Sequence, residues 1–166
     1  AEKPSIIRGN ASEIIALANL WGLESGQRAD GVRGVDATDP VEAARQAAVS
    51  LARWTGGAVA VSGEHDLITD GRCTAFSYGG SPFMEKITGA GCSLGGVAAV
   101  YATAADPFIA ALTASAVYNL AGKRAEARCS GPGSFQMEFL DALYQASAAD
   151  IAQNPLTIEA EKACIH

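Results

Sequence analysis

Short apolar strands alternate with helices along this chain of 166 residues, and this alternation restricts its fold more than any other feature. Strands are predicted at residues 5–7 and 58–62, and as a hairpin at residues 67–69 and 73–78. Helices are predicted at residues 14–21, 39–54, 93–103, 107–127 and 135–152. This order predicts an α/β protein, a three-layer sandwich with a mainly parallel sheet.

Local signals place several element ends. The run Asp39–Glu42 (DPVE) is typical of a helix start with Asp39 as N-cap, and Gly56-Gly57 is predicted to end that helix. Ser134 is predicted as the N-cap of the last helix. Residues 22–35, rich in Gly, Arg and Asp, are predicted as an exposed loop, and residues 153–166 show no clear pattern.

The sheet expected from this order is incomplete. Only about four strands are visible, against the ~5–6 of a typical sheet, and the first begins almost at residue 1. We therefore expect that the chain lacks its N-terminal portion, or that another polypeptide supplies the missing strands. Residues 1–152 are assigned to one domain and residues 153–166 to a tail.

Charge and cysteine content exclude several classes of partner and cofactor. With a net charge of −6 and no basic run, the chain is not expected to bind nucleic acid or an anionic membrane. No apolar run reaches the ~18–20 residues of a membrane span. The four cysteines form no C-x-x-C pair and predict neither a metal nor a redox motif. Without a secretory signal, they favour a reduced, cytoplasmic protein.

The run Ile87–Cys92 (ITGAGC) is a small-residue turn that opens directly into a helix. Backbone N–H groups and the positive end of the helix dipole predict an anion site there, with phosphate as its most common occupant. Taken alone, the turn is better explained by an ordinary buried cysteine at position 92, on a tight turn between a strand and a helix. A Cys–His enzyme would need His65 or His166 beside Cys92, and neither has a sequence context that indicates such a pair.

A second group of polar residues lies where the first strand meets the first helix. Asn10, followed three residues later by Glu13, has the spacing of a capping box. The same two residues could face a triphosphate, with Glu13 on Mg²⁺, which takes one or two carboxylates plus phosphate oxygens. Arg8 lies at the carboxyl end of the strand, where it could hold phosphate oxygens in a fork or stay solvated.

Five motifs together carry a family resemblance. In chain order they are Ile7–Glu13 (IRGNASE), Val61–Glu64 (VSGE), Thr69–Gly71 (TDG), Thr88–Cys92 (TGAGC) and Gly131–Phe135 (GPGSF). In this combination the chain resembles hydroxyethylthiazole kinases, which are members of the ribokinase-like superfamily. The resemblance extends from Lys3 to about Leu143. It implies the C-terminal part of such a kinase, without the first third that carries thiazole contacts and a further magnesium-binding carboxylate.

The resemblance implies an activity and a catalytic turn. The activity is transfer of the γ-phosphate of ATP to the hydroxyl of 4-methyl-5-(2-hydroxyethyl)thiazole, in thiamine salvage, with Mg²⁺ as cofactor. Thr88 would contact ATP, Gly89 would lie beside the substrate, and the catalytic residues would be Ala90, Gly91 and Cys92. Cys92 stands where the wider superfamily usually has an aspartate base. A helix N-terminus lowers the pKa of a thiol, so a thiolate base is feasible there.

The resemblance also assigns Arg8, Asn10 and Ser62 to ATP and Glu13 to the metal, and it implies a homotrimer. Ser62 keeps the hydroxyl, but not the methyl group, of the threonine that the family commonly has. Another ribokinase-like enzyme, such as a pyrimidine kinase or an ATP-dependent hydrate dehydratase, is an alternative against which Cys92 counts. A non-catalytic nucleotide-binding fragment is a second alternative.

Four further polar residues are ambiguous in the sequence. Glu64 and Asp70 suit the loops of a hairpin as well as a place near the nucleotide. Asn119 and Lys123 lie one helical turn apart and could border the adenine, although a solvated surface is favoured for both.

Overall fold

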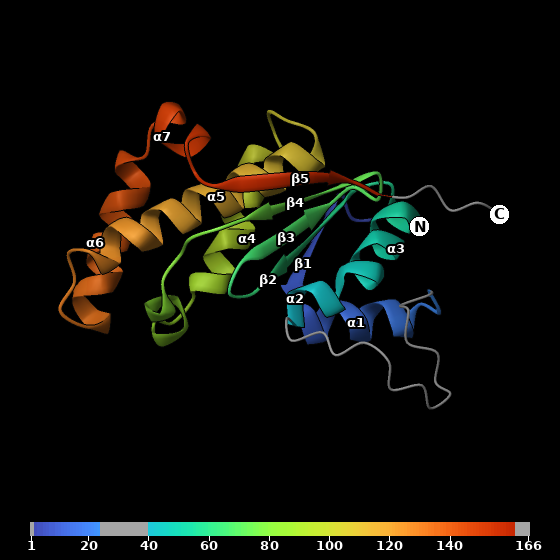
Figure 1. The fold of residues 1–166 in the computed structure, drawn as a ribbon, viewed down its shortest axis with the longest axis horizontal. Coiled ribbons are helices and arrows are strands. Elements are labelled where there is room, and N and C mark those ends of the chain that lie inside the picture. The colour runs from blue at the N-terminus through green and yellow to red at the C-terminus, as the bar shows by residue number, and fades with distance from the viewer. Residues whose placement is uncertain (1, 24–39, 162–166) are drawn as a thin grey trace. The chain divides into compact units, whose positions relative to one another are not determined.

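The described part of the molecule divides into two compact units. A computed structural model describes residues 2–23 and 40–161 (Figure 1). Unit 1 contains the described chain up to Phe76 and again from Thr157 onward, and unit 2 contains Ser77–Leu156. The single domain over residues 1–152 and the three-layer arrangement stay predictions.

Five strands form one sheet in the order β1-β2-β3-β4-β5. They are β1 (Ile6–Asn10), β2 (Ala58–Ser62), β3 (Asp66–Thr69), β4 (Cys73–Ser77) and β5 (Leu156–Ala160). The two strands and the hairpin predicted before residue 79 are therefore confirmed: β2 has the predicted bounds, and no end of the other strands is shifted by more than three residues.

The strand pairing differs from the prediction. β1 pairs with β2 in parallel, and β2 pairs with β3 antiparallel. The N–H of Tyr78 donates to the carbonyl of Pro155 at 3.0 Å, and the N–H of Glu161 donates to the carbonyl of Arg72 at 2.7 Å, so β4 and β5 also run antiparallel. The mainly parallel sheet is thus a wrong prediction for the described strands. The connections from β2 to β3 and β4 are too short for the crossover that parallel strands need.

Three helices of unit 1 lie on one face of the sheet (Figure 1): α1 (Ala11–Leu20), α2 (Pro40–Ala43) and α3 (Arg45–Thr55). With the strands they enclose an apolar cluster that includes Ile7, Ile14, Leu51, Val59 and Val61. The helix predicted at 39–54 is divided at Ala44. Its predicted N-cap, Asp39, and nearly all of the loop predicted at 22–35 lie outside the described residues. Gly56, with φ +75°, ends α3 as predicted.

The turn between β3 and β4 is closed by Asp70. Its Oδ1 accepts the N–H of Arg72 at 2.7 Å and that of Cys73 at 2.9 Å, and Gly71 has φ +84°. Burial raises the pKa of Asp70, but these hydrogen bonds outweigh it and leave the pKa below its ordinary value. The structure therefore explains Asp70 as a hairpin residue, while Glu64 is exposed.

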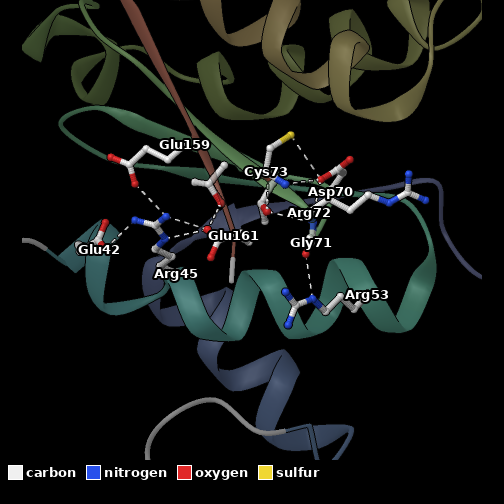
Figure 2. A network of polar contacts seen from close by, with 11 residues as sticks. Glu42, Arg45, Arg53, Asp70, Gly71, Arg72, Cys73, Glu159 and Glu161 are labelled. Atoms are coloured by element: carbon white, nitrogen blue, oxygen red, sulfur yellow. Dashed lines mark hydrogen bonds and ion pairs between the residues drawn. The ribbon is translucent and has the colours of Figure 1, made fainter. Parts of the chain in front are cut away.

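β5 is tied to unit 1 by a polar network around Arg45 (Figure 2). The guanidinium bonds Glu161 at 2.8 Å, Glu159 at 2.9 Å and Glu42 at 3.2 Å, and Glu161 also accepts from the hydroxyl of Thr74. Burial lowers the pKa of Arg45, and the hydrogen bonds to Glu161 and Glu159 raise it by more. The tail predicted from residue 153 onward is therefore wrong where the chain is described, because it contains this anchored strand.

Unit 2 is helical. Its elements are η1 (Pro82–Lys86, a 3₁₀ helix), α4 (Ala90–Tyr101), α5 (Pro107–Glu126), α6 (Pro132–Gln145) and α7 (Ala148–Ala152). Helix α5 packs against α4 and α6 around an aromatic core of Tyr118, Phe135 and Phe139. The helix predicted at 135–152 is two helices. Ser134 lies inside the first turn of α6, which follows Gly131, so its prediction as an N-cap is wrong.

Within the described residues, no helix is long and apolar enough to cross a membrane. The described cysteines, Cys73, Cys92 and Cys129, are free thiols. Cys164 lies outside the described residues.

Candidate active site

The first group of predicted site residues lies at the carboxyl ends of β1 and β2. Because these strands are parallel, both end at the same edge of the sheet, and the register pairs Asn10 with Ser62. Nη2 of Arg8 donates to Oγ of Ser62 at 3.1 Å. The structure thus brings together Arg8 and Ser62, which are far apart in the sequence and were both predicted to bind ATP.

The Arg8 side chain has an unused donor. Its Nε is buried and has no hydrogen-bond partner among the described residues. Ile7 belongs to the cluster under α1 and α3, so the alternation of side chains places Arg8 on the other face of β1. An unpaired buried N–H costs free energy, about 1–3 kcal/mol, and an oxygen-rich ligand on that face would remove this cost.

Asn10 and Glu13 form the capping box that their spacing predicts. Oδ1 of Asn10 accepts the N–H of Glu13 at 2.9 Å, and Oε2 of Glu13 accepts the N–H of Asn10 at 2.7 Å. A Cβ on Gly9 would lie 3.0 Å from that same Oε2, so glycine lets the carboxylate fold over the end of the strand. Both capping side chains are exposed.

The capping box leaves Glu13 able to serve a metal. Its Oε2 is engaged with Asn10, and Oε1 can reach an ion directly or through water. No group of three or more His, Cys, Asp or Glu residues that could hold a metal occurs within residues 2–23 and 40–161. Mg²⁺ suits such a sparse site, because it keeps several waters and uses one or two carboxylates beside phosphate oxygens.

The second group is the turn before α4, in unit 2. Gly89 occupies the N-cap position with φ +86°, a conformation that favours glycine, and α4 begins at Ala90 rather than at the predicted Ser93. Thr88, Gly91 and Cys92 are exposed. The first N–H groups of a helix have no acceptor within it, so this turn presents donors at the positive end of the helix dipole.

The first group lies in unit 1 and the second in unit 2. That the two groups form one site stays a prediction.

The structure differs from the expectation for Asn119, which is buried, with 8% of its surface exposed, and hydrogen-bonded to Ser77. Lys123 is exposed, as expected. His65 packs against Phe76, with ring centroids 5.7 Å apart, and His166 lies outside the described residues. Sequence reasoning missed Gly9, although a glycine between Arg8 and Asn10 was a visible signal.

Comparison with known proteins places the chain. The family model described as "Hydroxyethylthiazole kinase family" matches residues 1–149. The hydroxyethylthiazole kinase of Bifidobacterium longum strain DJO10A is 48% identical, over 96% of this chain and 56% of that protein. That of Cereibacter sphaeroides strain ATCC 17029 is 46% identical, over 89% of this chain and 53% of that protein.

A solved structure of similar fold agrees with these relatives. The hydroxyethylthiazole kinase protein from Pyrococcus horikoshii OT3 superposes with a TM-score of 0.78 at 26% identity, over 93% of this chain and 55% of that chain. An α/β fold with a glycine turn at a helix start and a polar edge on parallel strands is typical of proteins that bind phosphorylated ligands. The chain belongs to the hydroxyethylthiazole kinase family, and it spans about half the length of the curated relatives it matches.

Proposed function

We propose that this chain supplies the ATP-binding and phosphate-transfer part of a hydroxyethylthiazole kinase. The reaction moves the γ-phosphate of ATP to the hydroxyl of 4-methyl-5-(2-hydroxyethyl)thiazole. The observation that carries the proposal is Arg8, whose Nη2 is held by Ser62 and whose buried Nε lacks an acceptor among the described residues. A phosphate group supplies several acceptor oxygens to a guanidinium fork, which makes ATP the fitting ligand.

In this proposal the nucleotide binds at the carboxyl ends of β1 and β2. Arg8, Ser62 and Asn10 contact the phosphates of ATP, and Glu13 holds Mg²⁺ directly or through water. When bound, Mg²⁺ would neutralise charge on the phosphates. Glu13 would keep its bond to the N–H of Asn10, so the capping box would also orient the metal-binding carboxylate.

The turn before α4 carries out the transfer. Thr88 contacts ATP, Gly89 lies beside the alcohol, and the N–H groups of Ala90 and Gly91 stabilise negative charge on the transferring phosphate. The alcohol oxygen bonds to the γ-phosphorus while the bond from that phosphorus to the bridging oxygen of ADP breaks. The alcohol proton passes to the thiolate of Cys92.

The same proposal includes the assembly and location that the family resemblance implies. The chain would act in a homotrimer in the cytoplasm, with ATP and the thiazole alcohol as its small-molecule partners. Neither nucleic acid nor a membrane is among the proposed partners, in keeping with the net charge of −6.

Replacing Arg8 with methionine tests the proposal directly. Losing a charge-assisted hydrogen bond to phosphate costs about 1.5–3 kcal/mol, so the dissociation constant for Mg-ATP should rise at least about 10-fold. Isothermal titration calorimetry measures this constant, and thermal unfolding confirms that the variant is folded. Arg128→Met is the control, because this arginine is exposed and its only described ion pair is 3.8 Å long. Unchanged ATP affinity in a folded Arg8→Met variant would refute the assignment.

Glu13→Gln should separate the metal role from the cap. Glutamine can still accept the N–H of Asn10, so stability should change by less than about 1 kcal/mol. The gain in ATP affinity on adding Mg²⁺ should fall by about 10-fold, because the carboxylate charge is lost. A magnesium titration of ATP binding gives this number.

Asp150→Asn is the matched control for Glu13→Gln. Asp150 holds the equivalent position in the capping box of α7, where it bonds Ser147. This variant should alter a cap without altering the magnesium dependence. If Glu13→Gln left that dependence intact, Glu13 would be a capping residue only.

A further inference from the structure

Tyr118 and Asn119, two consecutive residues of α5, bond both ends of residues 77–93, the segment that contains the glycine turn before α4. At its start, Nδ2 of Asn119 donates to Oγ of Ser77 at 3.0 Å, and the Asn119 carbonyl accepts the N–H of Gly80 at 3.0 Å. At its end, the hydroxyl of Tyr118 donates to Oγ of Ser93 at 2.8 Å. All five residues belong to unit 2.

The hydrogen bond from Tyr118 continues into the turn itself. The hydroxyl of Ser93 donates to the carbonyl of Gly89 at 2.8 Å, with the carbonyl of Ala90 at 3.1 Å. A peptide group is planar, so fixing the Gly89 carbonyl also fixes the N–H of Ala90, which points the opposite way. The Ala90 carbonyl and the N–H of Gly91 are related in the same manner. The Gly89 carbonyl also accepts the backbone N–H of Ser93 at 2.9 Å. The two hydroxyls therefore add to this helical bond in fixing where the N–H groups of Ala90 and Gly91 point.

Tyr118 is itself rigidly held. Only 1% of its surface is exposed, and its ring packs edge-on against Phe139 with centroids 5.1 Å apart. Phe139 stacks on Phe135 at 5.8 Å, and Phe135 stacks on Phe83 of η1 at 5.5 Å. The Tyr118 hydroxyl is consequently a fixed reference point for the turn, whereas Ser93 and Gly89 are exposed.

We propose that Tyr118 is a positioning residue, whose hydroxyl acts through Ser93 to aim the N–H groups of Ala90 and Gly91. Its importance for phosphate binding rests on the proposed function, but its effect on the turn does not. Tyr118 would touch neither ATP nor the alcohol. Its contribution is to hold the donors in place before the ligand arrives, which lowers the entropy lost on binding.

The first test needs no ligand. Tyr118→Phe removes the hydroxyl oxygen and keeps the aromatic packing. Ser93→Ala removes the second hydroxyl of the relay, which is the pair of hydrogen bonds from Tyr118 to Ser93 and from Ser93 to the Gly89 carbonyl. In amide NMR spectra of the free protein, both variants should shift the same signals, those of Ala90 and Gly91, and should speed hydrogen exchange at Ser93. Tyr144→Phe is the matched control, because Tyr144 is 92% exposed on α6. Unchanged Ala90 and Gly91 signals in Ser93→Ala would overturn the inference, even if Tyr118→Phe failed to fold.

The second test asks whether the two hydroxyls act as one unit on ligand binding. Tyr118→Phe and Ser93→Ala should each weaken Mg-ATP binding by about 3- to 10-fold, the usual worth of a hydrogen bond. The double variant should lose no more than either single one, because both break the same relay. Ser93→Thr, which keeps a hydroxyl, should restore binding. Additive losses would overturn the inference, whereas an unchanged chain that failed to bind Mg-ATP would count against the proposed function alone.

Discussion

Replacing Cys92 with alanine is expected to slow phosphoryl transfer by about 10²- to 10⁴-fold, the usual contribution of a general base. Cys92 is exposed at the start of α4, where the helix dipole stabilises an anion. Cys92→Asp should keep much of the rate, because a carboxylate can also take the alcohol proton there. Cys92→Ser should resemble alanine, since a serine hydroxyl is too weakly acidic to be a base at neutral pH.

Single-turnover measurements give the rate of phosphate transfer separately from substrate binding, so they show whether a Cys92 variant slows the transfer itself. Cys129→Ala is the matched control: this thiol lies after α5 and contacts the carbonyl of Glu126 at 3.6 Å. Phosphoryl transfer can pass through a dissociative transition state in which proton removal comes late. In that case all Cys92 variants would keep nearly the parent rate, and Cys92 would only fill space in the turn.

The second large effect is expected on stability. Arg45→Met should lower the free energy of unfolding by about 3 kcal/mol, because it leaves several carboxylates close together without their cation. The Arg45 side chain is 23% exposed and that of Glu161 14%, so water can compensate only part of this loss. All five residues of β5 are exposed, which leaves the strand few buried contacts of its own. We therefore expect β5 to show the largest rise in hydrogen exchange.

Two companions make the Arg45 result specific. Arg45→Lys keeps the charge but cannot bond three carboxylates in a planar fork, so its loss of stability should be intermediate. Arg128→Met removes an exposed arginine paired at 3.8 Å and should change the free energy of unfolding by less than about 0.5 kcal/mol. Urea unfolding curves give all three values. Equal stability of Arg45→Met and the parent would mean that the hydrogen bonds between β4 and β5, and not Arg45, hold the strand.

Local patterns predicted the elements that have strong internal signals. The Asn10-x-x-Glu13 spacing predicted the capping box that the structure shows, and the Asp70-Gly71 pair predicted the hairpin turn. β5 was missed because its apolar residues, Leu156 and Ile158, alternate over only five residues, all of them exposed. The division of the last predicted helix left a signal that was overlooked, since Ser147 and Asp150 have capping-box spacing.

The candidate site was predictable residue by residue but not contact by contact. The family motifs singled out Arg8 and Ser62, yet only the register of β1 and β2 shows that they share a hydrogen bond. Asn119 looked like surface because it is polar and lies on a helix. Its burial depends on Ser77, which is far away in the sequence, and no local pattern reports such a contact.

The connection between the units has a consequence for the order of folding. The chain leaves the sheet at the end of β4, at Ser77, and returns at the start of β5, at Leu156. Because β4 and β5 are antiparallel neighbours, the whole of unit 2 takes the topological place of a hairpin loop. The entropy cost of closing a loop grows only slowly with its length, and a unit 2 that has already folded would bring the two strand ends together. Pairing of β5 with β4 should therefore follow the folding of unit 2, which makes completion of unit 1 a late event in folding.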